Sequence, residues 1–353
     1  MHVRPQMLAL AREAAGLTQK DLATTSGVSQ SQISKAENGL AALSEEDADA
    51  LAEATGVSPH LLSWNDQVHG LGTASFFHRK QHSLSQKALR KIQGQVTLLA
   101  MRSQRLAHGL TFESPLSLPH FDLDSGITPA EAAQRLRAHW RCPMGPLQGL
   151  IDHAEAAGAI VARRDFDTHR IDAISIWDPG ESPLIVLNWS LSPSRQRFVV
   201  AHEIGHLVLH EGVPPRDDAE KEADAFAEEL LLPRSELQRE LVGLDVKRAF
   251  ELKPYWQVPA QSIILRAEHL GVITQRRSRS LHAYMNKLGY LRRGQEPLEF
   301  AREEPAIVNE MVRIHKEEHR YSVQDMVSIL GLASPRQLGE FEGDSRDGLR
   351  IVH

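Results

Sequence analysis

The chain has 353 residues, which is too long for one small core and predicts two to three domains. Its single cysteine, Cys142, excludes an internal disulfide framework and a metal site built from several cysteines. The first ten residues lack the long apolar core of a secretory signal, and no later stretch approaches the ~20 apolar residues of a membrane span. We therefore expect a folded cytoplasmic protein without a membrane partner.

The net charge of −6 is spread unevenly along the chain. Residues 1–65 carry four basic and eight acidic side chains, whereas residues 66–110 carry seven basic side chains against Asp66 alone. A second basic stretch occupies residues 276–293. Basic helices near a DNA-binding segment can supply phosphate contacts, but solvated helix faces explain the same charges equally well.

The first predicted elements are short helices within residues 4–63, separated by glycine and by serine or threonine turn signals. Ser44 is a suitable N-cap for the helix that follows it. The pattern Arg12-x-x-x-Gly16-Leu-Thr-Gln19, continued through Gly27 to Gly39, resembles the Cro/cI-type (XRE) helix-turn-helix. The resemblance implies a five-helix DNA-binding domain over residues 1–65.

In such a domain the second helix of the motif reads base edges in the major groove. The residues expected at DNA are Gln19, Gln30, Ser31, Gln32 and Lys35. Readers of this type usually bind as dimers, so a homodimer is compatible with the sequence. The negative charge of residues 1–65 favours the alternative, a small helical domain used for protein contacts.

Residues 66–118 are predicted to be a basic helical connector and linker. Residues 76–108 contain no proline and one glycine, which indicates one long amphipathic helix. Residues 112–129 contain three prolines and mark the linker. Cleavage of the chain by itself between residues 66 and 118 would be one way to release the N-terminal domain.

Residues 119–235 mix helices with strands. Helices are expected at residues 129–140 and 147–157, and three short apolar runs at residues 159–162, 173–177 and 184–187 are predicted strands. The last of these runs is either a core strand or an edge strand able to pair with an extended peptide.

A helix opens at Ser192-Pro193, with a cap residue and a proline in its first turn, and is expected to run to about His210. It contains His202-Glu203-x-x-His206, whose two imidazoles lie on one face and can reach one ion. Glu203 would act as general base toward the attacking water. The rest of the helix is apolar nearly all round, so these polar groups need partners.

A third protein ligand is needed, because a catalytic zinc site uses three protein ligands and keeps one position open. His210 is unsuitable, since ~12 Å of helix axis separates it from His202. The next helix, predicted to end at Pro233, offers Glu220 as the third ligand, and Asp224 on the same face to hydrogen-bond a ligand imidazole. Glu222 lies on a different face and is the weaker candidate.

These two segments resemble the ImmA/IrrE family of metallo-endopeptidases, and the resemblance continues to Arg266-Ala267. It implies an α+β, predominantly helical protein with a zincin-like peptidase domain over residues 119–235 and a helical C-terminal region over residues 236–353. It also implies zinc, with manganese as an alternative, bound by the two histidines of the motif and by Glu220. Many relatives have asparagine where this chain has Asp224.

The family resemblance implies a site-specific endopeptidase that cuts a Cro/cI-type transcriptional repressor, often as a stress-response or mobile-element switch. The protein substrate expected here is therefore such a repressor. The alternative is a ligand- or metal-sensing transcriptional regulator whose peptidase fold does not cleave. The general base Glu203 argues against this alternative, because a sensor has no use for one.

Overall fold

The computed structural model describes residues 2–66, 68, 84–110, 115–177, 180–212, 217–292 and 295–342. The chain divides into two compact units, one made of residues 1–74, 80–113 and 306–353, and one made of residues 75–79 and 114–305. The last segment thus belongs to the same unit as the N-terminal helices. Among the described helices, none is long and apolar enough to cross a membrane.

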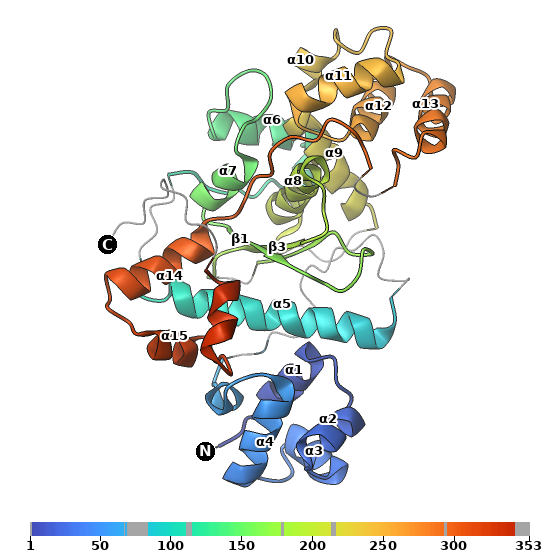
Figure 1. Ribbon diagram of the computed structural model, residues 1–353. Coiled ribbons are helices and arrows are strands. Elements are labelled where there is room, and N and C mark those ends of the chain that lie inside the picture. The colour runs from blue at the N-terminus through green and yellow to red at the C-terminus, as the bar shows by residue number, and fades with distance from the viewer. Residues whose placement is uncertain are drawn as a thin grey trace. The chain divides into compact units, whose positions relative to one another are not determined.

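The first unit is built from helices contributed by both ends of the chain (Figure 1). Its elements are α1 (Pro5–Ala14), α2 (Gln19–Ser26), α3 (Gln30–Glu37), α4 (Glu45–Thr55), η1 (Pro59–Ser63), α5 (Gln86–Ala107), α14 (Ile307–Glu317), α15 (Val323–Ile329) and η4 (Pro335–Glu340).

Local signals explain where the N-terminal helices begin and end. The Thr18 hydroxyl and the Asp21 carboxylate form a capping box at the start of α2, and Gly27, at φ 77°, makes the turn to α3. The hydroxyl of Ser44 accepts a hydrogen bond from the backbone of Asp47, as its N-cap position predicted. Leu22 and other fully buried side chains form the small core of these helices. The predicted helix-turn-helix arrangement is therefore confirmed.

The connector helix α5 begins at Gln86 because Ser85 caps it. The predicted helix over residues 76–108 is thus correct from Gln86 onward, and its first residues lie outside the described part of the chain. The C-terminal helices α14 and α15 pack on α5, from which Arg102 Nε donates to the carbonyl of Leu330 at 2.8 Å. The backbone N–H of Ser58 donates to Gly331 at 3.0 Å, which ties the two ends of the chain together.

The second unit combines a small sheet with helices (Figure 1). Its elements are η3 (Leu123–Ser125), α6 (Pro129–His139), α7 (Leu150–Ala156), β1 (Ile160–Arg164), β2 (Ala173–Ile176), β3 (Leu184–Asn188), α8 (Pro193–His210), α9 (Ala219–Leu231), α10 (Arg234–Leu237), α11 (Val246–Trp256), α12 (Ala260–His269) and α13 (Gln275–Lys287). The strand order is β1-β3-β2, with β3 parallel to β1 and antiparallel to β2. The expected predominantly helical α+β class is confirmed.

The sequence left two interpretations of β3 open, a core strand or an edge strand that could pair with a peptide, and its position in the sheet decides between them. It is hydrogen-bonded on both sides and all five of its residues are buried, so it is a core strand. Substrate cannot add to it as a further strand, because its backbone groups are already paired. The edge strand beside α8 is β2.

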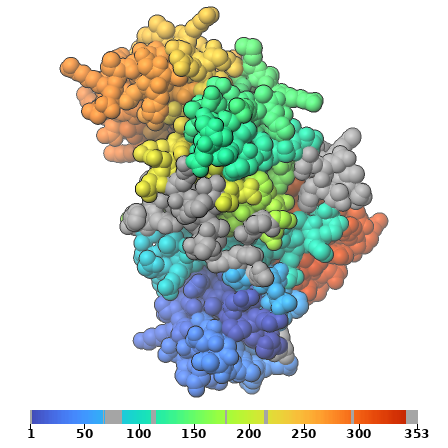
Figure 2. Space-filling view, turned by 180° about the vertical axis from the view of Figure 1, so that it is seen from behind, coloured from blue at the N-terminus to red at the C-terminus, as the bar shows by residue number. Residues whose placement is uncertain are grey.

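One hydrophobic core runs from α6 through the sheet to α13. Helix α8 lies at its centre, packed against α9 and the sheet, and 14 of its 18 residues are buried. Figure 2 shows, from behind, the surface of α6 and the following loop (green) at the same end of this unit as the helices α10–α13 (yellow to orange). The carboxylate of Glu236 in α10 accepts from the backbone N–H of Gly145 in that loop.

An extended segment, residues 295–304, crosses this unit as a strap after α13 (Figure 1). Glu296 and Glu299 each lie 2.8 Å from the ammonium of Lys253, whose side chain is 0% exposed. Glu303 pairs with the buried Arg197 of α8. Buried charges are stable only when paired, so these contacts hold the strap in place. The sequence, which indicated helices almost throughout this region, did not predict it.

Candidate functional site

Helix α8 carries the His-Glu-x-x-His motif against α9 (Figure 1). Gly205 allows the close approach, because a Cβ at this position would lie 3.1 Å from Phe226 Cδ1 and 3.2 Å from Ala223 Cα. Ala223 follows Glu220 by one helical turn. The two helices therefore present their functional side chains to the same small volume.

Three donor atoms converge between these helices. His202 Nε2 lies 3.1 Å from His206 Nε2 and 3.7 Å from a carboxylate oxygen of Glu220, whose other oxygen lies 3.4 Å from His206 Nε2. Ligands at 2.0–2.1 Å from a tetrahedral zinc are separated by about 3.4 Å, so the observed spacing fits one ion. Glu220 Oε1 is buried without a hydrogen-bond partner, which is costly unless a cation balances it.

The outer nitrogens of both imidazoles are hydrogen-bonded. His202 Nδ1 lies 3.0 Å from Asp224 Oδ1, the contact that the sequence predicted for this residue. His206 Nδ1 lies 3.1 Å from His210 Nδ1, and His210 Nε2 lies 2.8 Å from the Glu222 carboxylate. A histidine bound through Nε2 carries its proton on Nδ1, so both contacts suit a metal-binding imidazole.

Glu203 faces the sheet instead of solvent. Its carboxylate accepts a hydrogen bond of 2.6 Å from the hydroxyl of Ser175 in β2. Burial raises the pKa of Glu203 to about 8, the bond from Ser175 opposes this shift, and the charges of Glu220 and Asp172 add to it. Ser175 was not among the residues predicted for the site, although it is the one polar residue in an otherwise apolar strand.

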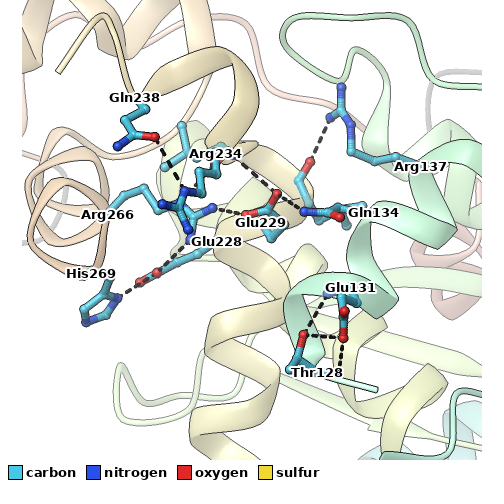
Figure 3. Close-up of polar contacts among 12 residues, drawn as sticks. Thr128, Glu131, Gln134, Arg137, Glu228, Glu229, Arg234, Gln238, Arg266 and His269 are labelled. Atoms are coloured by element: carbon cyan, nitrogen blue, oxygen red, sulfur yellow. Dashed lines mark hydrogen bonds and ion pairs between the residues drawn. The ribbon is translucent and has the colours of Figure 1, made fainter. Parts of the chain in front are cut away.

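Ion pairs behind the site fix the far end of α9 (Figure 3). Glu229 accepts a hydrogen bond of 2.8 Å from Gln134 in α6 and pairs with Arg266 in α12. Glu228 lies 2.8 Å from His269 Nδ1 and 3.7 Å from Arg266. Both glutamates are buried, so α9 cannot slide without separating charges in a medium of low dielectric constant. This resistance keeps Glu220 at its distance from the two histidines.

The predicted DNA-contacting residues lie on the first unit. Gln30, Ser31, Gln32 and Lys35 are exposed on α3. Gln19 is half-buried, and its amide donates to Glu37 at 2.8 Å and accepts from Gln30 at 3.3 Å. The first turns of α2 and α3 are thereby linked side chain to side chain.

Taken together, these features define a metallopeptidase-type domain joined to a DNA-binding helix-turn-helix. Residues 154–268 match the family described as IrrE N-terminal-like domain, and residues 8–62 match a helix-turn-helix family. The predicted resemblance to an ImmA/IrrE peptidase with an N-terminal helix-turn-helix is thus confirmed, and with it the assignment to metalloproteases and transcription regulation. The comparison with curated proteins gave no match.

Proposed function

We propose that the chain is a zinc-dependent endopeptidase of the glutamate-zincin type, with manganese as an alternative metal. His202, His206 and Glu220 would hold the ion, and Asp224 would orient the imidazole of His202. The observation that carries the proposal is the convergence of three donor groups, two imidazole nitrogens and the Glu220 carboxylate, with one ligand atom from each lying within 4.8 Å of the others. The buried Oε1 of Glu220, which accepts no hydrogen bond, adds support.

In this proposal Glu203 moves the proton. His202, His206 and Glu220 would hold a dication, which would supply an acidified water with a pKa of about 7, polarise the scissile carbonyl and favour the ionised form of Glu203. The carboxylate then accepts the proton of the attacking water and passes it to the leaving amine of the peptide. Ser175, 2.6 Å away, holds the carboxylate in one orientation.

We further propose that the substrate is a Cro/cI-type repressor and that its cleavage acts as a regulatory switch. The DNA-binding helix-turn-helix on the same chain supports this substrate class. A helix-turn-helix domain bound near an operator raises the effective concentration of the attached peptidase around repressors on neighbouring DNA. Such a tether can raise the cleavage rate without any additional contact to the substrate.

The test uses the purified full chain, zinc or manganese, and Cro/cI-type repressors from the same organism. We expect one of these repressors to be cut once by the parent chain, and not by Glu203→Gln. Glu240→Gln, at the partly exposed Glu240, is the matched control and should cleave like the parent. Tight metal binding without cleavage by any variant would contradict the peptidase and support the non-cleaving sensor.

A further inference from the structure

The helix-turn-helix segment has few cations available for DNA. The guanidinium of Arg12 is 2.6 Å from Glu37 and its side chain is 11% exposed, so it stabilises the domain instead of meeting phosphate. Lys20 and Lys35 are exposed. Duplex binding commonly uses about 6–10 phosphate contacts, so a further source of positive charge is needed.

Helix α5, in the same unit, carries five basic side chains and no acidic one between Gln86 and Ala107. Two of them lie near its C-terminal end, where Arg102 bonds to the backbone of Leu330 and Arg105 pairs with Asp66. The other three, Lys87, Arg90 and Lys91, lie in the first two turns. Lys87 and Arg90 are exposed, and Lys91 is half-buried.

Close packing fixes these two turns beside α1 and α2. The backbone of Gly94 approaches α1 so closely that a Cβ there would lie 2.6 Å from the N atom of Ala14. The stem of Lys91 covers Gly16 in the turn between α1 and α2, where an added Cβ would lie 3.0 Å from Lys91 Cδ. The position of the basic turns is therefore set by backbone contact.

Side-chain contacts connect the first two turns of α5 to the recognition helix α3. Lys87 Nζ lies 3.1 Å from Asp21 in the first turn of α2. Gln19, in the same turn, hydrogen-bonds Gln30 at the start of α3. In DNA-binding proteins, helix N-termini commonly face the phosphate backbone. The first turn of α2 would therefore meet a DNA strand there, and the cations of α5 lie next to that place.

We propose that Lys87, Arg90 and Lys91 form a phosphate-binding extension of the helix-turn-helix and contact the DNA backbone beside the recognition helix. The pair between Lys87 and Asp21 does not prevent this, because both side chains are about half exposed and such pairs contribute little. A duplex phosphate is a stronger partner in the same place. The inference is independent of the peptidase proposal.

The experiment measures binding of the full chain to a mixed-sequence 30-base-pair DNA duplex between 50 and 200 mM KCl. The variant carries Lys87→Gln, Arg90→Gln and Lys91→Gln. Its matched control removes the same charge from the exposed face of α13 through Arg276→Gln, Arg279→Gln and Lys287→Gln. Circular dichroism and thermal unfolding establish that both variants are folded.

The slope of log K against log salt should become shallower by about 0.9 for each phosphate that the protein no longer neutralises, hence by up to about 2.7 in the α5 variant. The single change Arg90→Gln should account for about 0.9 of this difference. The control should retain the parental slope. The proposal is overturned by an unchanged slope in the α5 variant, by an equally shallow slope in the control, or by a parent chain that does not bind the duplex.

Discussion

Gly205 offers a direct way to test whether the spacing of α8 and α9 sets the metal site. In Gly205→Ala the new methyl group would lie 3.1 Å from Phe226 Cδ1 and 3.2 Å from Ala223 Cα. Non-bonded carbon atoms pack best at separations of about 3.5–4.0 Å, so the two helices must separate by several tenths of an ångström. Gly205 stands between His202 and His206 in the sequence, so the separation would be transmitted to these two proposed ligands.

The effect on stability and the effect on metal binding should differ in size. Alanine gains about 0.8–1.0 kcal/mol over glycine within a helix, whereas overpacking costs about 1–3 kcal/mol, so the net loss of stability should be about 0–2 kcal/mol. Metal sites tolerate about 0.2 Å in ligand distance, and disturbed supporting contacts typically cost about 10–100-fold in affinity. We therefore expect a nearly stable protein that binds zinc at least about tenfold more weakly.

Urea unfolding of the metal-free protein gives the first quantity, and competition with a chromophoric chelator gives the zinc affinity. Gly339→Ala is the matched control, because a Cβ at Gly339 meets no atom within 4 Å. It should leave the zinc affinity at its parental value and raise the stability by no more than about 1 kcal/mol. Parental zinc affinity in Gly205→Ala would refute the claim that helix spacing sets the site.

Three further predictions concern the groups around the site. In metal-free protein the raised pKa of Glu203 means that the folded state binds its proton more strongly, so stability should fall as the pH rises from about 4.5 to about 8. Glu203→Gln should abolish that part of the pH dependence in urea titrations, and an unchanged dependence would contradict the assignment. His210→Ala should weaken zinc binding about 10–100-fold by removing the partner of His206, and parental affinity would exclude a supporting role. Lys253→Met should cost about 3–5 kcal/mol in urea unfolding, because it leaves the acidic strap residues without their cation, and a loss below about 1 kcal/mol would argue against that anchoring.

Much of the site could be predicted because its parts are local in the sequence. The helix expected from Ser192-Pro193 to about His210 matches α8 (Pro193–His210), since the cap, the proline and the apolar periodicity all act within a few residues. The face shared by Glu220 and Asp224 follows from helical repeat alone, and the structure places both side chains at the paired histidines.

The remainder depends on contacts between distant segments. The bond from Ser175 to Glu203 requires β2 to lie at the sheet edge next to α8, and periodicity does not determine strand order. The link from His210 to Glu222 depends on the relative rotation of two helices. The strap at residues 295–304 has no periodic pattern that would predict it, because its order comes from charge pairing with residues 40 or more positions earlier, such as Lys253.

The discontinuous first unit has consequences for synthesis and for switching. Its helices α14 and α15 leave the ribosome only after the whole peptidase unit has been made, so their packing on α5 must wait until then, whereas α1 can pack on α5 earlier. The chain also passes between the two units four times, after residues 74, 79, 113 and 305. A single cleavage of the chain before α5 would leave the helix-turn-helix domain attached to the rest of its unit by noncovalent packing. Release of this domain would then require a second cleavage or local unfolding.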